Sequence, residues 1–198
     1  MCLAIWILPI QTWTLWGLGP PQGRWLAYIM PDAVSVIDTS SILQVRRIIA
    51  RQEQQGIYDK LTVLVQGDSL FFPKEVVVEL ERWSNPDPSS TDLPLEWVKT
   101  NSHKATKHGV HFDELKLVLE QVQEVHDPDK LGVEEADPYV LALAIHLQNQ
   151  GKQVMVLTEE RKDRPDKISM TTACGVLRLH CLPIHMFLRI NGIWQATN

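Results

Sequence analysis

Apolar and polar positions alternate in blocks along the chain, and each block indicates one helix or one strand. Residues 34–37 form a short β-branched run, which is typical of a strand. Residues 42–55 then carry apolar side chains at helical spacing, which predicts a helix that ends at Gly56. The first part of the chain is therefore expected to be a strand, a turn and a helix.

A second group of elements follows in similar order. Residues 58–66 are expected to form a helix that ends at Gly67, and residues 69–72 are expected to form a strand. Pro73 then suits the first turn of a helix that runs to Trp83. This helix carries a core-facing apolar stripe with carboxylates on either side of it.

The middle of the chain is expected to be a loop and two helices. Residues 84–94 are rich in proline and short polar residues, which disfavour both helix and strand. Residues 95–104 and 113–126 have apolar positions at helical spacing. We expect these two helices to form a cap over the core.

The last third of the chain returns to alternating helices and strands. Asp137 at the N-cap and Pro138 after it predict the start of a strongly apolar helix. Strands are expected at residues 154–157 and 176–179, and a final helix at residues 183–189. Alternating strands and helices predict an α/β fold of three layers, with a central parallel sheet flanked by helices and a helical cap.

The composition is that of a globular, acidic chain. Hydrophobic residues make up 44% and charged residues 22% of the 198 residues, which excludes disordered and fibrous classes. The net charge of −5 argues against a nucleic-acid binder, because affinity for phosphates rests mainly on Lys and Arg. That inference weakens if several carboxylates surround a divalent cation, since the ion then supplies the local positive charge.

The first 29 residues differ from the rest of the chain. They are rich in Trp and Leu, and Arg24 is their only charged residue. They lack the features of a signal peptide, and polar residues interrupt any membrane span, so no contact with a membrane is expected. We expect residues 1–29 to be an atypical extension upstream of a true start at Met30, and residues 30–198 to form one domain.

Cysteine and histidine residues carry no recognisable site. The three cysteines and seven histidines have no spacing typical of a zinc site or a disulfide framework. This favours reduced thiols in a cytoplasmic protein.

Acidic residues are expected to gather at the edge where parallel sheets bind their ligands. Asp38 follows the first strand, and Glu159 and Glu160 follow the strand at residues 154–157. Asp137 begins a helix that enters the same layer, and Glu79 can reach the edge from the helix after Pro73. Carboxylates gathered at one edge repel one another unless they are protonated or neutralised. Oxygen ligands suit Mg²⁺ or Mn²⁺, and such an ion can activate a water for attack on a phosphodiester. The pattern therefore indicates metal-dependent hydrolysis of a nucleic-acid backbone.

The acids lie in four segments, which are VSVIDTSSIL, PKEVVVELERW, EEADPYVLALA and VMVLTEE. In order and approximate spacing these segments resemble the acidic motifs of the PIN domain family. The resemblance covers nearly everything after Met30 and is closest to the bacterial branch that includes VapC-type toxin ribonucleases, within it to an uncharacterised PIN-like subgroup. It implies a PIN-like fold and an endoribonuclease, a hydrolase that cleaves RNA phosphodiester bonds with Mg²⁺ or Mn²⁺.

The resemblance also implies roles for single residues. The catalytic and metal-binding set that it implies is Asp38, Glu79, Asp137 and Glu160. The fourth acid of the family usually follows two residues after a Thr, where Glu160 stands here, and the neighbouring Glu159 is the alternative. Ser40 and Thr158 are expected to contribute to cofactor binding, because their hydroxyls can support the first carboxylate or its water.

The expected partners follow from the same resemblance. They are an RNA substrate, an antitoxin protein if the chain is the toxin of a toxin–antitoxin pair, and a second copy in a homodimer. Arg161, Lys162 and Arg164 could contact the RNA backbone or form a solvated charged face.

Two other interpretations stay open. Asp38 and Asp137 could be ordinary helix caps, a role that typically contributes ~1 kcal/mol. The chain could also be a catalytically inactive PIN-fold protein that binds RNA or serves as a scaffold. The complete set of acids argues against this second interpretation, because a degenerate site is expected to lose an acid.

Overall fold

A parallel sheet with strand order β2-β1-β3-β4 forms the centre of the molecule. Its strands are β1 (Ala33–Ile37), β2 (Leu70–Phe71), β3 (Gln153–Leu157) and β4 (His180–Leu182). β1 and β3 pair from Ala33↔Gln153 to Ile37↔Leu157, so the two central strands end side by side.

The computed structural model describes residues 33–83, 92–125 and 135–195. The expectation for residues 1–29, and most of that for the loop at residues 84–94, lies outside these residues. In the part of the chain that is described, no helix has the length and apolar character needed to cross a membrane.

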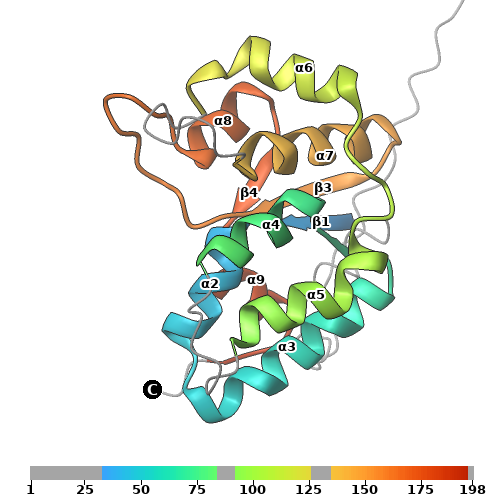
Figure 1. Cartoon of the computed structure of the whole chain (residues 1–198), viewed down its shortest axis with the longest axis vertical. Coiled ribbons are helices and arrows are strands. Elements are labelled where there is room, and N and C mark those ends of the chain that lie inside the picture. Colours follow the sequence, from blue (N-terminus) through green and yellow to red (C-terminus); the bar gives the residue numbers. More distant parts are fainter. Residues whose placement is uncertain (1–32, 84–91, 126–134, 196–198) are drawn as a thin grey trace, which may run out of the picture.

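Helices cover both faces of the sheet and make three layers (Figure 1). On one face lie α7 (Asp137–Asn149), α6 (Phe112–Gln121) outside it and α8 (Met170–Val176) beside β4. On the other face lie α2 (Thr39–Ile48), α3 (Arg51–Gln66), α4 (Lys74–Trp83), α5 (Leu93–Ala105) and α9 (Ile184–Ile190). A short 3₁₀ turn, Gln123–Val125, follows α6. The predicted α/β fold with a central parallel sheet flanked by helices is confirmed.

The two helices expected to form one cap lie in different layers. α5 packs on α3 and α4, whereas α6 packs on α7. Each helix buries its apolar stripe on the nearest helix, with Trp97 and Val98 buried in α5 and Val118 in α6. An apolar stripe predicts that a helix face is covered, but it does not say by which partner.

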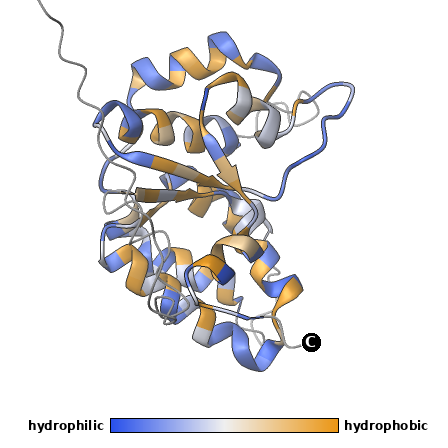
Figure 2. Ribbon diagram, turned by 180° about the vertical axis from the view of Figure 1, so that it is seen from behind, coloured by the Kyte–Doolittle hydropathy of each residue, from blue (hydrophilic) through white to orange (hydrophobic). Residues whose placement is uncertain are grey.

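α7 is apolar around its whole circumference because it lies between α6 and the sheet. Every residue from 140 to 145 is buried. Figure 2 shows how apolar and hydrophilic residues are distributed over the molecule. Apolar residues lie on the strands, and hydrophilic residues lie in the long loop after β3. Since α7 leads back to the start of β3, its first residue lies at the edge where the parallel strands end.

The first helix ends earlier than its glycine suggested. The chain breaks at Ile49, which has φ −105° and ψ 133°, and Gly56 lies inside α3. The side chain of Gln54 donates from Nε2 to the carbonyls of Arg46 at 3.1 Å and Ile49 at 2.9 Å. The predicted stop at Gly56 is therefore wrong, since a glycine inside a helix costs only about 1 kcal/mol.

The predicted strand at residues 176–179 is also wrong, because this segment ends α8 and turns into β4. Ser169 caps α8 by accepting a hydrogen bond from the Thr172 N–H at 3.2 Å. Arg178 has a φ of 56°, which turns the chain in the left-handed region before the strand. A short apolar run does not distinguish a short helix from a strand.

Candidate active site

The carboxyl ends of β1 and β3 place Asp38 beside Thr158. The backbone N–H of Asp38 donates to the carbonyl of Leu157 at 2.9 Å, which extends the strand pairing by one residue. The N–H of Thr158 donates to the carbonyl of Leu182 at 3.1 Å in the same way. Both residues are buried, so the sheet backbone itself fixes where their side chains begin.

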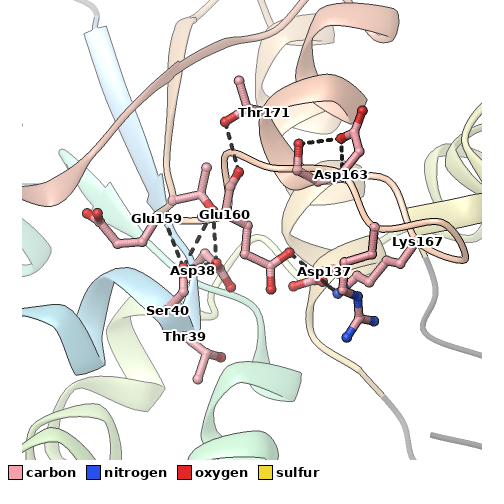
Figure 3. Close-up of polar contacts among 12 residues, drawn as sticks. Asp38, Thr39, Ser40, Asp137, Glu159, Glu160, Asp163, Lys167 and Thr171 are labelled. Carbon is pink, nitrogen blue, oxygen red and sulfur yellow. Dashed lines mark hydrogen bonds and ion pairs between the residues drawn. The ribbon is translucent and has the colours of Figure 1, made fainter. Parts of the chain in front are cut away.

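The carboxylate of Asp38 is held by two hydroxyl groups (Figure 3). Ser40 Oγ donates to Oδ2 at 2.5 Å, and Thr158 Oγ1 donates to the same oxygen at 3.1 Å. Asp38 occupies the N-cap position of α2, yet its side chain makes no capping hydrogen bond. The carboxylate is therefore turned towards the sheet edge, and the helix-cap interpretation does not describe it.

Glu79 reaches the same place from α4. Its side chain is only 9% exposed and follows the buried stripe formed by Val76 and Leu80. Thr39 Oγ1 donates to Glu79 Oε2 at 2.7 Å. Because Thr39 directly follows Asp38, this bond ties the second acid to the first.

Asp137 is the first residue of α7 and is buried. Ala136 occupies the N-cap position, so the prediction that Asp137 would be the cap is wrong by one residue. Pro138 follows in the first turn, where its missing N–H leaves no donor unsatisfied. The Asp137 side chain makes no cap and instead accepts a hydrogen bond from Lys167 Nζ at 2.6 Å through Oδ2.

The neighbouring glutamates after β3 point to different partners. Glu160 Oε2 lies 3.4 Å from Lys167 Nζ, next to Asp137. Glu159 Oε1 instead accepts a hydrogen bond from the backbone N–H of Ile184 at 2.7 Å, at the start of α9. Of the two alternatives left open by the sequence, Glu160 is the one that joins the other acids.

Burial and mutual repulsion perturb the acid cluster, by which we mean Asp38, Glu79, Asp137 and Glu160. Burial raises the pKa of Asp38 well above its ordinary value, and the charge of Asp137 adds to the rise. Glu160 and Glu79 raise the pKa of Asp38 further. Burial and Glu160 likewise raise the pKa of Asp137, although Lys167 opposes them. Acids from four separate segments therefore act on one another in one place.

A buried lysine that the sequence did not single out lies within this cluster. The Lys167 side chain is only 7% exposed and contacts both Asp137 and Glu160. Burial opposes its charge, but the two carboxylates outweigh burial and raise the pKa of Lys167 above its ordinary value. A lysine in a charged loop is usually solvated, so only the proximity of the other basic residues could have drawn attention to it.

Another buried acid beside the cluster, Glu135, was also missed. It lies two residues before Asp137 and is 2% exposed. Its charge raises the pKa values of both Asp137 and Lys167, after the larger effects of burial and of their nearer partners. Its place just before a motif residue was the only available signal.

The chemistry of the acid cluster suits a hard divalent cation, although its present geometry does not. Its donors are carboxylate oxygens, which Mg²⁺ and Mn²⁺ prefer, and a cation would relieve the repulsion between Asp38 and Asp137. Among residues 33–83, 92–125 and 135–195, no three His, Cys, Asp or Glu side chains are grouped to hold a metal. Lys167 takes the place of a cation between Asp137 and Glu160, so metal binding requires the carboxylates to rearrange.

The match with a known protein family spans the sheet and the acid cluster. No curated protein and no solved structure matches the chain. The family match covers residues 35–194, from within β1 to beyond α9. This range is more than half of the chain, which therefore belongs to the family described as Domain of unknown function (DUF4411).

Proposed function

We propose that the chain is a cytoplasmic endoribonuclease that hydrolyses RNA phosphodiester bonds at the acid cluster with Mg²⁺ or Mn²⁺. The observation that carries this proposal is the convergence of four carboxylates, two of them with raised pKa values because they are buried together. Buried carboxylates that repel one another destabilise a fold, so their presence calls for a functional reason. The resemblance of the four segments to PIN motifs supports the same activity.

The residues of the cluster have separate tasks in this proposal. Asp38, Glu79, Asp137 and Glu160 would hold the ion. Ser40 and Thr158 would hold the Asp38 carboxylate in place, because both donate a hydrogen bond to its Oδ2. A bound Mg²⁺ or Mn²⁺ would supply an activated water and neutralise the charge that develops on the phosphate. Lys167 would add the positive charge of a protein side chain to that of the ion.

Glu159 and Glu160 offer a matched pair for the test. Glu160→Gln and Glu159→Gln remove the same charge from adjacent positions, but only Glu160 belongs to the acid cluster. We expect the purified protein to cleave RNA with Mn²⁺, and we expect chelator or Asp38→Asn to abolish cleavage. Glu160→Gln should lower the rate about 100-fold or more, while Glu159→Gln stays near the wild-type rate. Folded protein that binds Mn²⁺ but cleaves no RNA would exclude the nuclease.

The main alternative is a PIN-fold protein that binds RNA or acts as a scaffold without hydrolysis. If this alternative holds, the wild-type protein binds RNA in the presence of Mn²⁺, but a gel shows no cleavage products. The complete acid cluster favours the nuclease, because a site kept only for binding has no need of four acids that repel one another.

A toxin role, with an antitoxin and a homodimer as partners, is the finer part of the proposal and rests on the resemblance alone. Expression of the wild-type chain in bacteria would then arrest growth, and expression of the Asp38→Asn variant would not. Light scattering measures the homodimer directly. Normal growth with an active nuclease would remove the toxin role and leave the enzymatic one.

A further inference from the structure

A groove of about 800 Å³ opens beside the acid cluster. Glu160 and Lys167 line the end that belongs to the cluster, and Trp83 lines the groove as well. Three more basic residues, Arg161, Lys162 and Arg164, line it together with Glu159. A chain that runs along this groove would pass the acids.

Trp83 is placed to meet a ligand of the acid cluster. It is the last residue of α4 and is 61% exposed. Glu79 stands four residues earlier on the same helix, and residues at this spacing share one face. The indole therefore lies one helical turn beyond a buried acid of the cluster, on the side that opens to solvent.

The loop after β3 gives the groove four basic residues, which are Arg161, Lys162, Arg164 and Lys167, against two acids, Glu159 and Glu160. Glu159 accepts from the N–H of Ile184, and Asp163 Oδ1 accepts from Ser169 N and Oγ, each at 2.8 Å. Arg161 and Lys162 are exposed. The groove lining is thus net positive, although the chain as a whole has a negative net charge.

The same loop is held in place by its own hydrogen bonds. The backbone N–H and the hydroxyl of Thr171 both donate to the carbonyl of Glu160, at 3.1 and 2.9 Å. Arg164 N–H donates to the carbonyl of Lys167 at 2.8 Å. Thr172 Oγ1 adds a third hydrogen bond to Asp163 at 2.8 Å. The basic side chains therefore start from a preorganised backbone.

We propose that this groove is a subsite for one unpaired nucleotide next to the bond that is cut. Its base stacks on Trp83, and its phosphates lie on Arg161 and Lys162. An exposed aromatic ring beside basic side chains is the combination that binds single-stranded nucleic acid, because any base can stack while the cations hold the backbone. A base inside a duplex has both faces covered and cannot use the ring, so the subsite selects unpaired RNA.

This inference rests on the proposed function, and binding measurements separate the two. The full chain with Asp38→Asn serves as the background, because it should bind RNA without cutting it. The probes are a short unstructured RNA and a duplex of the same length, each with a fluorescent label, and anisotropy reports their affinity in Mg²⁺ at low salt.

Trp83→Ala is expected to weaken binding of the unstructured RNA about 5- to 100-fold, and Trp83→Phe to restore most of it. Binding of the duplex should not change with either variant. Phe112→Ala is the matched control, since Phe112 is a 77% exposed aromatic on α6 that does not line this groove. The double variant Arg161→Ala/Lys162→Ala should lower the affinity for both RNA probes, and its affinity should depend less steeply on the salt concentration.

The outcomes distinguish the two proposals. If the wild-type protein cleaves RNA but Trp83→Ala binds the unstructured RNA as well as its parent does, the subsite is overturned and the nuclease stands. If nothing is cleaved but the loss at Trp83 is specific for unpaired RNA, the subsite stands without the nuclease. If the Trp83→Ala variant keeps its affinity for RNA but no longer binds a protein partner, the groove serves protein recognition and the subsite is overturned.

Discussion

The ammonium group of Lys167 lies 2.6 Å from Oδ2 of Asp137, and both side chains are less than a tenth exposed. The same nitrogen is 3.4 Å from Oε2 of Glu160. A buried cation of the protein itself thus offsets part of the negative charge of the acid cluster. Truncation of one partner in such a pair leaves the other charge buried without compensation.

Lys167→Met is therefore expected to destabilise the protein. The change keeps most of the side-chain stem but leaves Asp137 buried beside Glu160, which should lower the free energy of unfolding at neutral pH by about 3 kcal/mol. The loss should shrink as the pH falls and Asp137 takes up a proton. Urea denaturation at several pH values measures both effects. Lys162→Met, at an exposed lysine of the same loop, should stay within about 0.5 kcal/mol of the wild type.

Metal binding is expected to depend on the acid cluster and not on acidity in general. Mn²⁺ at 100 times its dissociation constant should stabilise the folded protein by about 2.7 kcal/mol and raise its melting temperature. Glu160→Gln should weaken this effect, while Glu159→Gln should leave it unchanged, because Glu159 faces α9. Titration calorimetry gives the affinities. Equal loss in both variants would place the ion outside the cluster.

Asp38→Asn is expected to stabilise the metal-free protein at neutral pH. The raised pKa of Asp38 means that its ionised form disfavours the folded state, so stability is fully present below the ordinary pKa of 3.8 and falls as the pH rises through the folded value. The gain from the amide should be largest at neutral pH and vanish near pH 3.8. Thermal unfolding in chelator across this range tests it, and a gain independent of pH would contradict the electrostatic cause.

Cys181 is expected to be the more reactive thiol of the pair that it forms with Cys174. A hydrogen bond with Cys174 lowers the pKa of Cys181 to about 6, with a smaller contribution from Thr171. The same contact, together with burial, raises the pKa of Cys174. Iodoacetamide at neutral pH should modify Cys181 first, and peptide mapping by mass spectrometry follows both sites. Equal rates at the two thiols would argue against this assignment.

The sheet and most of the acid cluster could be predicted because both depend on short local signals. The β-branched run at residues 34–37 and the apolar run at residues 154–157 are contiguous, and an acid follows each of them. Parallel strands bring their carboxyl ends to one edge of the sheet. The proximity of Asp38 and Glu160 could therefore be predicted without knowing how the intervening chain folds.

The breaks between elements could not be predicted in this way. The end of α2 depends on the side chain of Gln54, which reaches back to the carbonyl of Ile49. The turn between α8 and β4 depends on the left-handed conformation of Arg178. Apolar spacing carries no information on either contact. Lys167 was missed for a related reason, since its burial follows from where its loop returns to α7.

The pairing of β1 with β3 has a consequence for the synthesis of the protein. Asp38 and Thr158 are in hydrogen-bond contact although they stand 120 residues apart. Contacts between residues so far apart in sequence form late in folding, because the entropy cost of closing a long loop comes before the contact can stabilise the fold. A chain still emerging from a ribosome, or one cut before residue 153, can pair β1 with β2 but lacks β3 and Thr158 beside its first acid. Under the proposed function, cleavage of RNA is therefore expected only after β3 has joined the sheet and brought Thr158 to Asp38.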